Sequence, residues 1–110
     1  MARDHELEQR VLDDLGPLPG LSEKAMFSGL VWLLDGHMLC AATGEGLMVR
    51  LGKGNDAWAL QEPDIAVVVM SGKPMPGWVR AGMGACADEQ LRRRLLDAAV
   101  TFVGALPPKS

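Results

Sequence analysis

The chain has 110 residues, of which 48% are hydrophobic and 23% charged, with a formal net charge of −3 at pH 7. This length predicts one domain with its own core, and the composition excludes a disordered protein. The acidic balance argues against DNA binding by this domain alone, and no apolar run is long enough to span a bilayer. Two cysteines are too few for a disulfide framework, so we expect a cytoplasmic protein with reduced thiols.

The N-terminal segment predicts an amphipathic helix. Asp4 is a residue type that caps helix N-termini. Gly16-Pro17 is a pair that ends helices, because glycine adopts the C-terminal capping conformation and proline cannot continue the helix. The apolar residues between them recur at helical spacing and would face a core. They are Leu7, Val11, Leu12 and Leu15.

The next segment predicts a three-stranded antiparallel meander. Asp35-Gly36 stands between two β-prone apolar runs, a pattern typical of a β-hairpin. A second turn at Thr43–Gly46 would lead into a third strand, in which Met48 and Arg50 share one face because side chains alternate along a strand. The expected strands cover residues 30–34, 37–42 and 47–51.

The second half predicts a short helix, two strands and a final helix. Asn55 is placed to cap the short helix, which Pro63 limits. The run Ala66–Met70 predicts a buried strand and Trp78–Ala81 a shorter one, joined by a glycine- and proline-rich connection. The final helix would begin after Asp88 as its cap, and one side of it would face the core. The residues expected on that side are Leu91, Leu95, Ala98, Ala99, Phe102 and Val103. The order α-β-β-β-α-β-β-α predicts an α+β domain with helices packed on an antiparallel sheet.

Three patterns resemble functional motifs, and in each case a structural interpretation is favoured. His37 and Cys40, with Cys86, could ligate a metal, but strand alternation would put His37 and Cys40 on opposite faces. The glycines around Lys53 do not have the spacing of a phosphate-binding loop. The run Arg92–Arg94 spreads around a helix and predicts a solvated face. We therefore expect no metal and no cofactor.

Six segments of the chain, taken in order, resemble a known family. They are Met26–Leu30, Asp35–Met38, Gly46–Arg50, Gly72–Met75, Gly77–Val79 and Leu106–Lys109. Together they resemble the N-terminal domain of the TfoX/Sxy family, named for bacterial regulators of natural competence, over about residues 23–109. The resemblance implies a bacterial, stand-alone member with a single domain over residues 1–110. It also implies an α-β3-α-β2-α arrangement similar to type III secretion chaperones, which equals the order inferred above.

The expected function is that of a regulatory or protein-interaction domain that is not an enzyme. No acid/base pair or nucleophile set is recognisable in the chain, and the resemblance carries over no catalytic residues. Full-length competence regulators have a second, helical domain to which the resemblance does not extend, so the resemblance does not imply a direct competence role for this domain alone. The expected partner is another protein or a second copy of the chain, and not a membrane.

The alternative is a domain that binds a small molecule or another anionic ligand in a groove near Arg50, Lys73 and Trp78. Arginine suits such a ligand because its guanidinium group binds a carboxylate or phosphate through two hydrogen bonds. Met75, which lies between two prolines, is the methionine expected to be most exposed. The candidate ligand or partner surface comprises Met48, Arg50, Lys73, Met75, Trp78 and Arg80.

Overall fold

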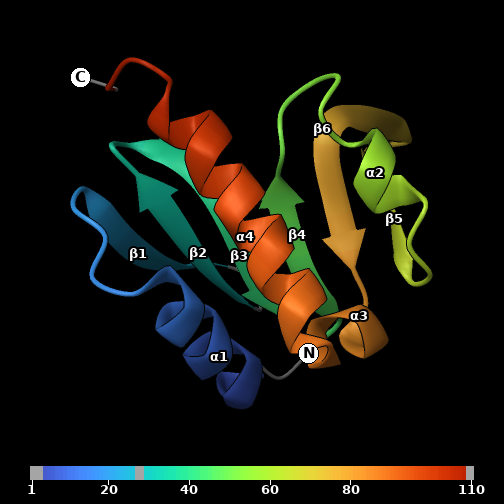
Figure 1. Cartoon of the computed structure of the whole chain (residues 1–110), viewed down its shortest axis with the longest axis horizontal. Coiled ribbons are helices and arrows are strands. Elements are labelled where there is room, and N and C mark those ends of the chain that lie inside the picture. The colour runs from blue at the N-terminus through green and yellow to red at the C-terminus, as the bar shows by residue number, and fades with distance from the viewer. Residues whose placement is uncertain (1–3, 27–28, 109–110) are drawn as a thin grey trace.

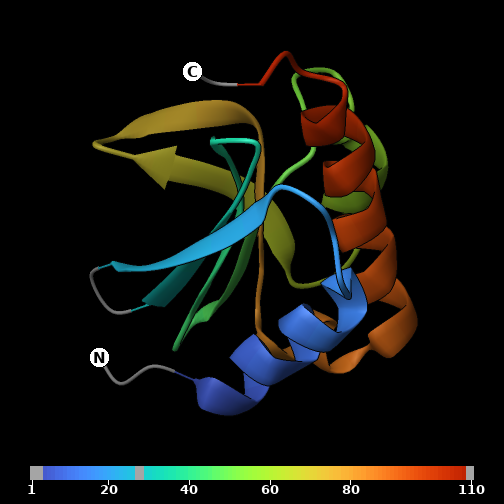
Figure 2. The ribbon, with the colours of Figure 1, turned by 90° about the vertical axis from the view of Figure 1, so that its left-hand side faces the viewer.

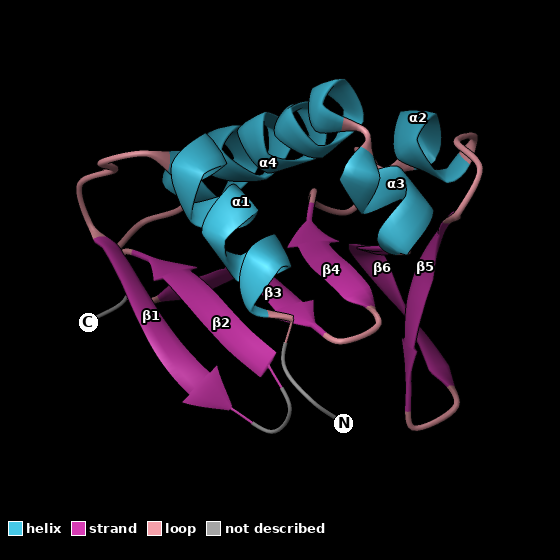
Figure 3. Ribbon diagram, turned by 90° about the horizontal axis from the view of Figure 1, so that it is seen from below, coloured by secondary structure: helices cyan, strands magenta, loops and turns pink. Residues whose placement is uncertain are grey.

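The computed structural model describes residues 4–26 and 29–108 of the chain. Within these residues, six strands form one open antiparallel sheet in the spatial order β1-β2-β3-β4-β6-β5, and four helices lie on one of its faces (Figures 1 and 3). The strands are β1 (Leu21–Met26), β2 (Gly29–Leu34), β3 (His37–Thr43), β4 (Gly46–Arg50), β5 (Ile65–Met70) and β6 (Lys73–Ala81). The helices are α1 (His5–Leu15), α2 (Ala57–Leu60), α3 (Met83–Ala87) and α4 (Glu89–Gly104). The α+β class is confirmed, and the eight predicted elements occur in the predicted order.

Two elements, β1 and α3, are additions to the predicted order. Strand β1 has the polar sequence LSEKAM and pairs along its whole length with β2 as an edge strand. Its pairing with β2, rather than its own composition, makes it a strand. Helix α3 has only five residues, MGACA, and the backbone N–H of Ala85 donates to the Asp64 carboxylate at 3.0 Å. That carboxylate supports a helix too short to show any periodicity.

The core lies between the sheet and the helices α1 and α4, which cross its covered face (Figure 2). Alternate residues of the strands point into this core, and the inward side of α4 closes it. Leu12, expected on the inner side of α1, is 40% exposed because that helix is buried along the side of Leu7 and Val11. The largest fully buried side chains include Trp32, Leu39, Leu47, Leu51, Leu95 and Leu96.

The predicted helix caps are confirmed for the two long helices. The Asp4 carboxylate accepts a hydrogen bond from the first turn of α1 at 3.0 Å, and the Asp88 carboxylate accepts one from the first turn of α4 at 3.1 Å. Helix α2 begins one residue later than predicted, because Asp56 and not Asn55 precedes its first helical residue.

A β-bulge in β3 changes which residues of this strand face the helices. The register pairs His37 with Leu34 and Cys40 with Trp32, and it shifts between these two pairs. Because Leu34 and Trp32 share a face of β2, His37 and Cys40 also lie on one face, and the expectation of opposite faces is wrong. The Nε2 atom of His37 lies 2.7 Å from a backbone carbonyl oxygen near the C-terminus. Within residues 4–26 and 29–108, no three His, Cys, Asp or Glu side chains gather as metal ligands would.

The stretch over residues 72–84 is largely a strand rather than the connection expected from its prolines. Strands β5 and β6 form a hairpin with Ser71-Gly72 as its turn, and β6 begins directly afterwards. Its two prolines are tolerated because β4 pairs with β6 only from Trp78 onward, which leaves the first half of β6 with a free edge. Strand β5, expected to be buried, is instead an edge strand, and Val69 is 56% exposed.

We expect both thiols to be unreactive in the folded protein. Burial raises the pKa of Cys86 to about 11 and raises that of Cys40 still further. Because the thiolate is the reactive form, a disulfide reagent such as 5,5′-dithiobis(2-nitrobenzoate) at pH 8 should label neither cysteine until the chain is unfolded in guanidinium chloride. Rapid labelling of one thiol per native chain would contradict this prediction.

The same raised pKa has a consequence for stability at alkaline pH. The folded pKa of Cys86 lies above its ordinary value of 9.0, so the protonated thiol stabilises the fold below pH 9. This contribution is lost as the pH rises toward 11.

Candidate functional site

The face of the sheet opposite the helices, here called the open face, brings together five of the six predicted site residues: Met48, Arg50, Met75, Trp78 and Arg80. Strand β4 pairs with β6 so that Met48 lies beside Arg80 and Arg50 beside Trp78. Cross-strand partners point to the same face of a sheet, and these four alternate with residues that point into the core. The pairing therefore places both arginines on one face, which the sequence alone left open.

The open face contains a small apolar cavity, here called the methionine cavity. Its volume is about 110 Å³, and it is lined by Met38, Met48, Val68, Met70, Met75 and Trp78. These side chains come from β3, β4, β5 and β6, and they include four of the seven methionines in the chain. Figure 2 shows the β5–β6 hairpin projecting from the sheet on the side away from the helices. Thioether side chains are flexible and polarisable, so a cavity that they line adapts to the shape of its occupant.

Some predicted site residues lie elsewhere than expected, and others were missed. Lys73 is exposed at the start of β6 and does not line the methionine cavity. Met75 is partly buried in the cavity, so the expectation that it would be the most exposed methionine is wrong; Met70 is 54% exposed. Sequence reasoning missed Met38, Val68 and Met70. Met38 lies next to the bulge in β3, and Val68 and Met70 belong to a strand that was expected to be buried.

The two arginines of the open face pack against a methionine sulfur and against aromatic rings. The Nη2 atom of Arg80 lies 3.9 Å from the Met48 sulfur. The guanidinium carbon of Arg50 lies 5.9 Å from the centre of the Trp78 ring and 5.5 Å from that of Phe102 on α4. A guanidinium group held over aromatic rings keeps its N–H groups available for an anion.

The charge on the open face is positive, although the chain as a whole is acidic. In the described part of the chain, Arg50, Lys73 and Arg80 form no ion pair. Glu23 is the one acid within the six strands, and it lies on the face that the helices cover. Glu45, in the β3–β4 turn, borders the same surface hollow as Arg80 without pairing with it. The open face therefore combines an apolar cavity with positive charge.

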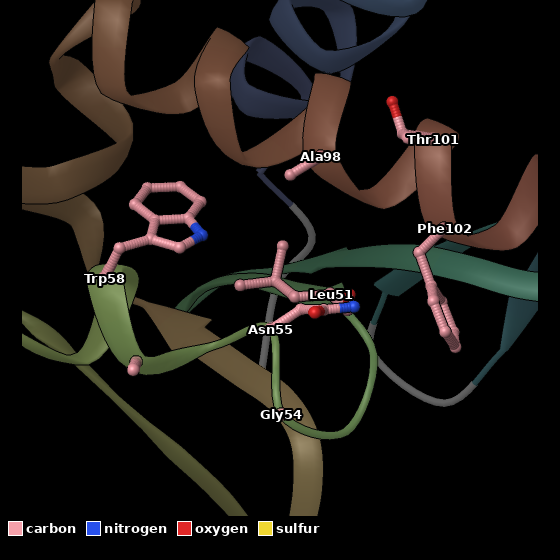
Figure 4. A pocket seen from close by; sticks show the side chains of 8 residues that line it. Leu51, Gly54, Asn55, Trp58, Ala98, Thr101 and Phe102 are labelled. Carbon is pink, nitrogen blue, oxygen red and sulfur yellow. Dashed lines mark hydrogen bonds between the residues drawn. The ribbon is translucent and has the colours of Figure 1, made fainter.

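A larger hollow lies on the opposite side of the sheet, between α4 and the segment that joins β4 to α2 (Figure 4). Its volume is about 660 Å³. Trp58 and Phe102 stand at its two ends, with Leu51 and Asn55 between them (Figure 4). We call it the helix-side groove, and the residues that line it are Leu51, Gly54, Asn55, Ala57, Trp58, Ala98, Thr101 and Phe102.

The three consecutive arginines of α4 have three different environments, so the prediction of one solvated face is wrong. Arg92 is buried, with its Nε atom 2.5 Å from the Asp14 carboxylate and its Nη1 atom donating to the Cys86 carbonyl oxygen at 2.9 Å. The hydrogen bond that Arg92 donates to the Asp14 carboxylate raises the pKa of Arg92. Arg93 is exposed and also pairs with Asp14, at 3.1 Å. Arg94 packs over the indole ring of the helix-side groove, 4.1 Å from its centre.

Comparison with known proteins identifies a family match for most of the chain. A family model described as the TfoX N-terminal domain matches residues 13–103. A search of curated proteins and a search of solved structures each found no match. Among the described residues, none of the four helices has the length and hydropathy needed to cross a membrane.

Proposed function

The chain belongs to the TfoX N-terminal domain family, and we propose that it is a regulatory or protein-interaction domain that acts by binding and not by catalysis. The observation that carries this proposal is the methionine cavity bordered by unpaired cations on the open face. Apolar surface that is left accessible beside arginine side chains is typical of protein-interaction surfaces.

The occupant that fits this surface is a segment of a partner protein with one apolar side chain flanked by carboxylates. A cavity of about 110 Å³ has room for one aliphatic or methionine side chain. For comparison, an apolar cavity of roughly 150 Å³ holds a benzene molecule, so a nucleotide would not fit. Arg80 and Arg50 lie beside cavity residues, where each could bind a flanking carboxylate through two hydrogen bonds.

Selection of short random peptides on the immobilised chain tests this proposal. We expect the selected peptides to share an aliphatic residue or methionine with Asp or Glu on either side. Binding of a selected peptide, followed by fluorescence anisotropy, should weaken about tenfold or more in Met48→Lys, because a charge would then enter the cavity. Arg80→Gln should weaken it about threefold, as expected for one partly exposed ion pair.

Lys24→Gln is the matched control for the loss of a cation. Lys24 pairs with Val31, which places it on the open face in β1, four strands away from β6. At about 4.8 Å per strand, it lies roughly 20 Å from Arg80 along the sheet and should change the affinity less than twofold.

Three results would contradict the proposal. One is a selection that yields basic peptides or none. Another is binding that Met48→Lys leaves unchanged. The third is a stable dimer in size-exclusion chromatography that selected peptides do not disturb, which would assign the open face to a second copy of the chain. Phosphate or acetate shifting the NMR signals of Arg80, without any selected peptide, would instead favour the anionic-ligand alternative.

A further inference from the structure

We propose that the helix-side groove is a second binding site, which takes a small organic anion with a flat apolar body. The site lies on the covered side of the sheet, so it shares no cavity residue with the open face. Its volume of about 660 Å³ falls within the range of small-molecule sites, about 300–1,000 Å³. The proposal is independent of the partner assigned to the open face.

The groove is held open by the backbone that forms its floor. The N–H groups of Leu51 and Gly52 both donate to the Gly77 carbonyl oxygen, at 2.7 and 3.2 Å, which fixes the end of β4 against β6. The Asn55 N–H donates to the Gly52 carbonyl oxygen at 2.9 Å, and its side-chain amide donates to the Leu51 carbonyl oxygen at 3.4 Å. The Phe102 ring packs so closely on Gly52 that a Cβ atom there would lie 2.5 Å from it. The floor and one end wall are therefore preformed.

The surfaces inside the groove suit a flat apolar body. Trp58 and Phe102 provide aromatic rings at the two ends, and Leu51 and Ala98 line the space between them (Figure 4). Aromatic and aliphatic walls with a few polar groups are typical of small-molecule sites.

The Trp58 end of the groove supplies hydrogen-bond donors and positive charge. The Arg94 guanidinium carbon lies 4.1 Å from the centre of the indole ring, and the indole N–H points into the groove (Figure 4). Within residues 4–26 and 29–108, neither the indole N–H nor the Arg94 side chain has a hydrogen-bond acceptor or an ion-pair partner. The indole N–H lines the groove, and Arg94, which does not line it, places a positive charge beside the same ring. A donor with a cation next to it favours a ligand group that only accepts, such as a carboxylate or sulfonate.

The acids near the groove do not cancel this charge. The Asp56 carboxylate is held at β6, where it accepts a hydrogen bond from the Gly77 N–H at 3.3 Å, and among the described residues it forms no ion pair with Arg94. Asp97 is exposed on α4 and forms no ion pair with Arg94 in the described part of the chain. At the other end, the cation near Phe102 is Arg50, which belongs to the open face. The anionic group of the ligand is therefore assigned to the Trp58 end, where the indole N–H and Arg94 lie.

The test uses 8-anilinonaphthalene-1-sulfonate, a flat aromatic sulfonate, as the probe for the full chain. We expect its binding, followed by fluorescence and by backbone NMR shifts, to perturb the signals of Asn55, Ala98 and Thr101. Trp58→Ala should weaken binding about tenfold, and Arg94→Gln about threefold. The uncharged analogue N-phenyl-1-naphthylamine should bind the wild-type chain more weakly than the sulfonate, and Arg94→Gln should leave its affinity unchanged.

Met48→Lys is the control, because it alters the open face and leaves the groove intact. Probe binding that falls in Met48→Lys, or NMR shifts confined to residues of the methionine cavity, would overturn the groove assignment while supporting an apolar site on the open face. Unchanged affinity in both Trp58→Ala and Arg94→Gln would also overturn it. Arg94 is exposed, so its variant keeps the test decisive even if Trp58→Ala lowers stability.

Discussion

Replacing Gly77 with alanine is expected to destabilise the fold by about 3 kcal/mol or more, since two separate costs add. The residue has φ of +87°, a conformation that an alanine adopts with strain. A Cβ atom would also lie 2.5 Å from the Lys53 nitrogen and 2.6 Å from the Gly52 carbonyl carbon, which are backbone atoms that cannot rotate away. Urea unfolding followed by tryptophan fluorescence measures the loss.

Gly72→Ala is the matched control for the backbone strain alone. Gly72 also has a positive φ, +76°, but nothing lies within 4 Å of a Cβ atom built on it. We expect it to cost only about 1–2 kcal/mol, the cost of the left-handed conformation. Equal losses in the two variants would show that the close approach at Gly77 contributes nothing.

Replacing Asp14 with alanine is expected to cost about 3–5 kcal/mol, because it leaves a buried charge without its partner. The side chains of Asp14 and Arg92 are 3% and 6% exposed, and their ion pair joins α1 to α4 across the covered face of the sheet. The measurement is again the free energy of unfolding in urea. The matched control is Glu6→Ala, which removes the exposed pair between Glu6 and Arg10 at 3.0 Å and should cost less than about 0.5 kcal/mol.

A double variant separates the lost charge pair from lost packing. Asp14→Ala combined with Arg92→Met removes both charges, and we expect it to recover a large part of the stability that Asp14→Ala loses. A double variant less stable than Asp14→Ala would mean that Arg92 stabilises the fold mainly through its other contacts, such as its hydrogen bond to the Cys86 carbonyl oxygen.

The sequence predicts the elements whose signals are local. Asp4 and Asp88 cap their helices as expected, and Asp35-Gly36 forms the turn between β2 and β3. Strand β1 and the first half of β6 escape prediction because their residues favour loops, and only pairing with neighbouring strands makes them extended. Local propensity carries no information about such a neighbour.

Of the candidate site, the sequence predicts only the alternation of Met48 and Arg50. Their meeting with Arg80 and Trp78 depends on the pairing of β4 with β6, which are separated by α2 and β5 in the chain. The bulge in β3 and the extra residues of β6 between Pro74 and Val79 break the alternation in those two strands, which hides the contribution of Met38 and the way Met75 and Trp78 come to line the same cavity. The helix-side groove combines α4 with the loop after β4, and four elements lie between the two in the chain, so no sequence pattern marks it.

The pairing of β4 with β6 also has a kinetic consequence. In strands β1 to β4 each strand follows the previous one after only two residues of the chain, so each of their pairings closes a short loop, whereas joining β6 to β4 must close the loop that contains α2 and β5. Helix α4 packs on β2, β3 and β4, and it is synthesised after all three of these strands. During synthesis on the ribosome, Leu47 and Val49 therefore stay uncovered until nearly the whole chain has emerged. The apolar face of the meander is then the surface most prone to aggregate, and its protection depends on how quickly the last helix docks.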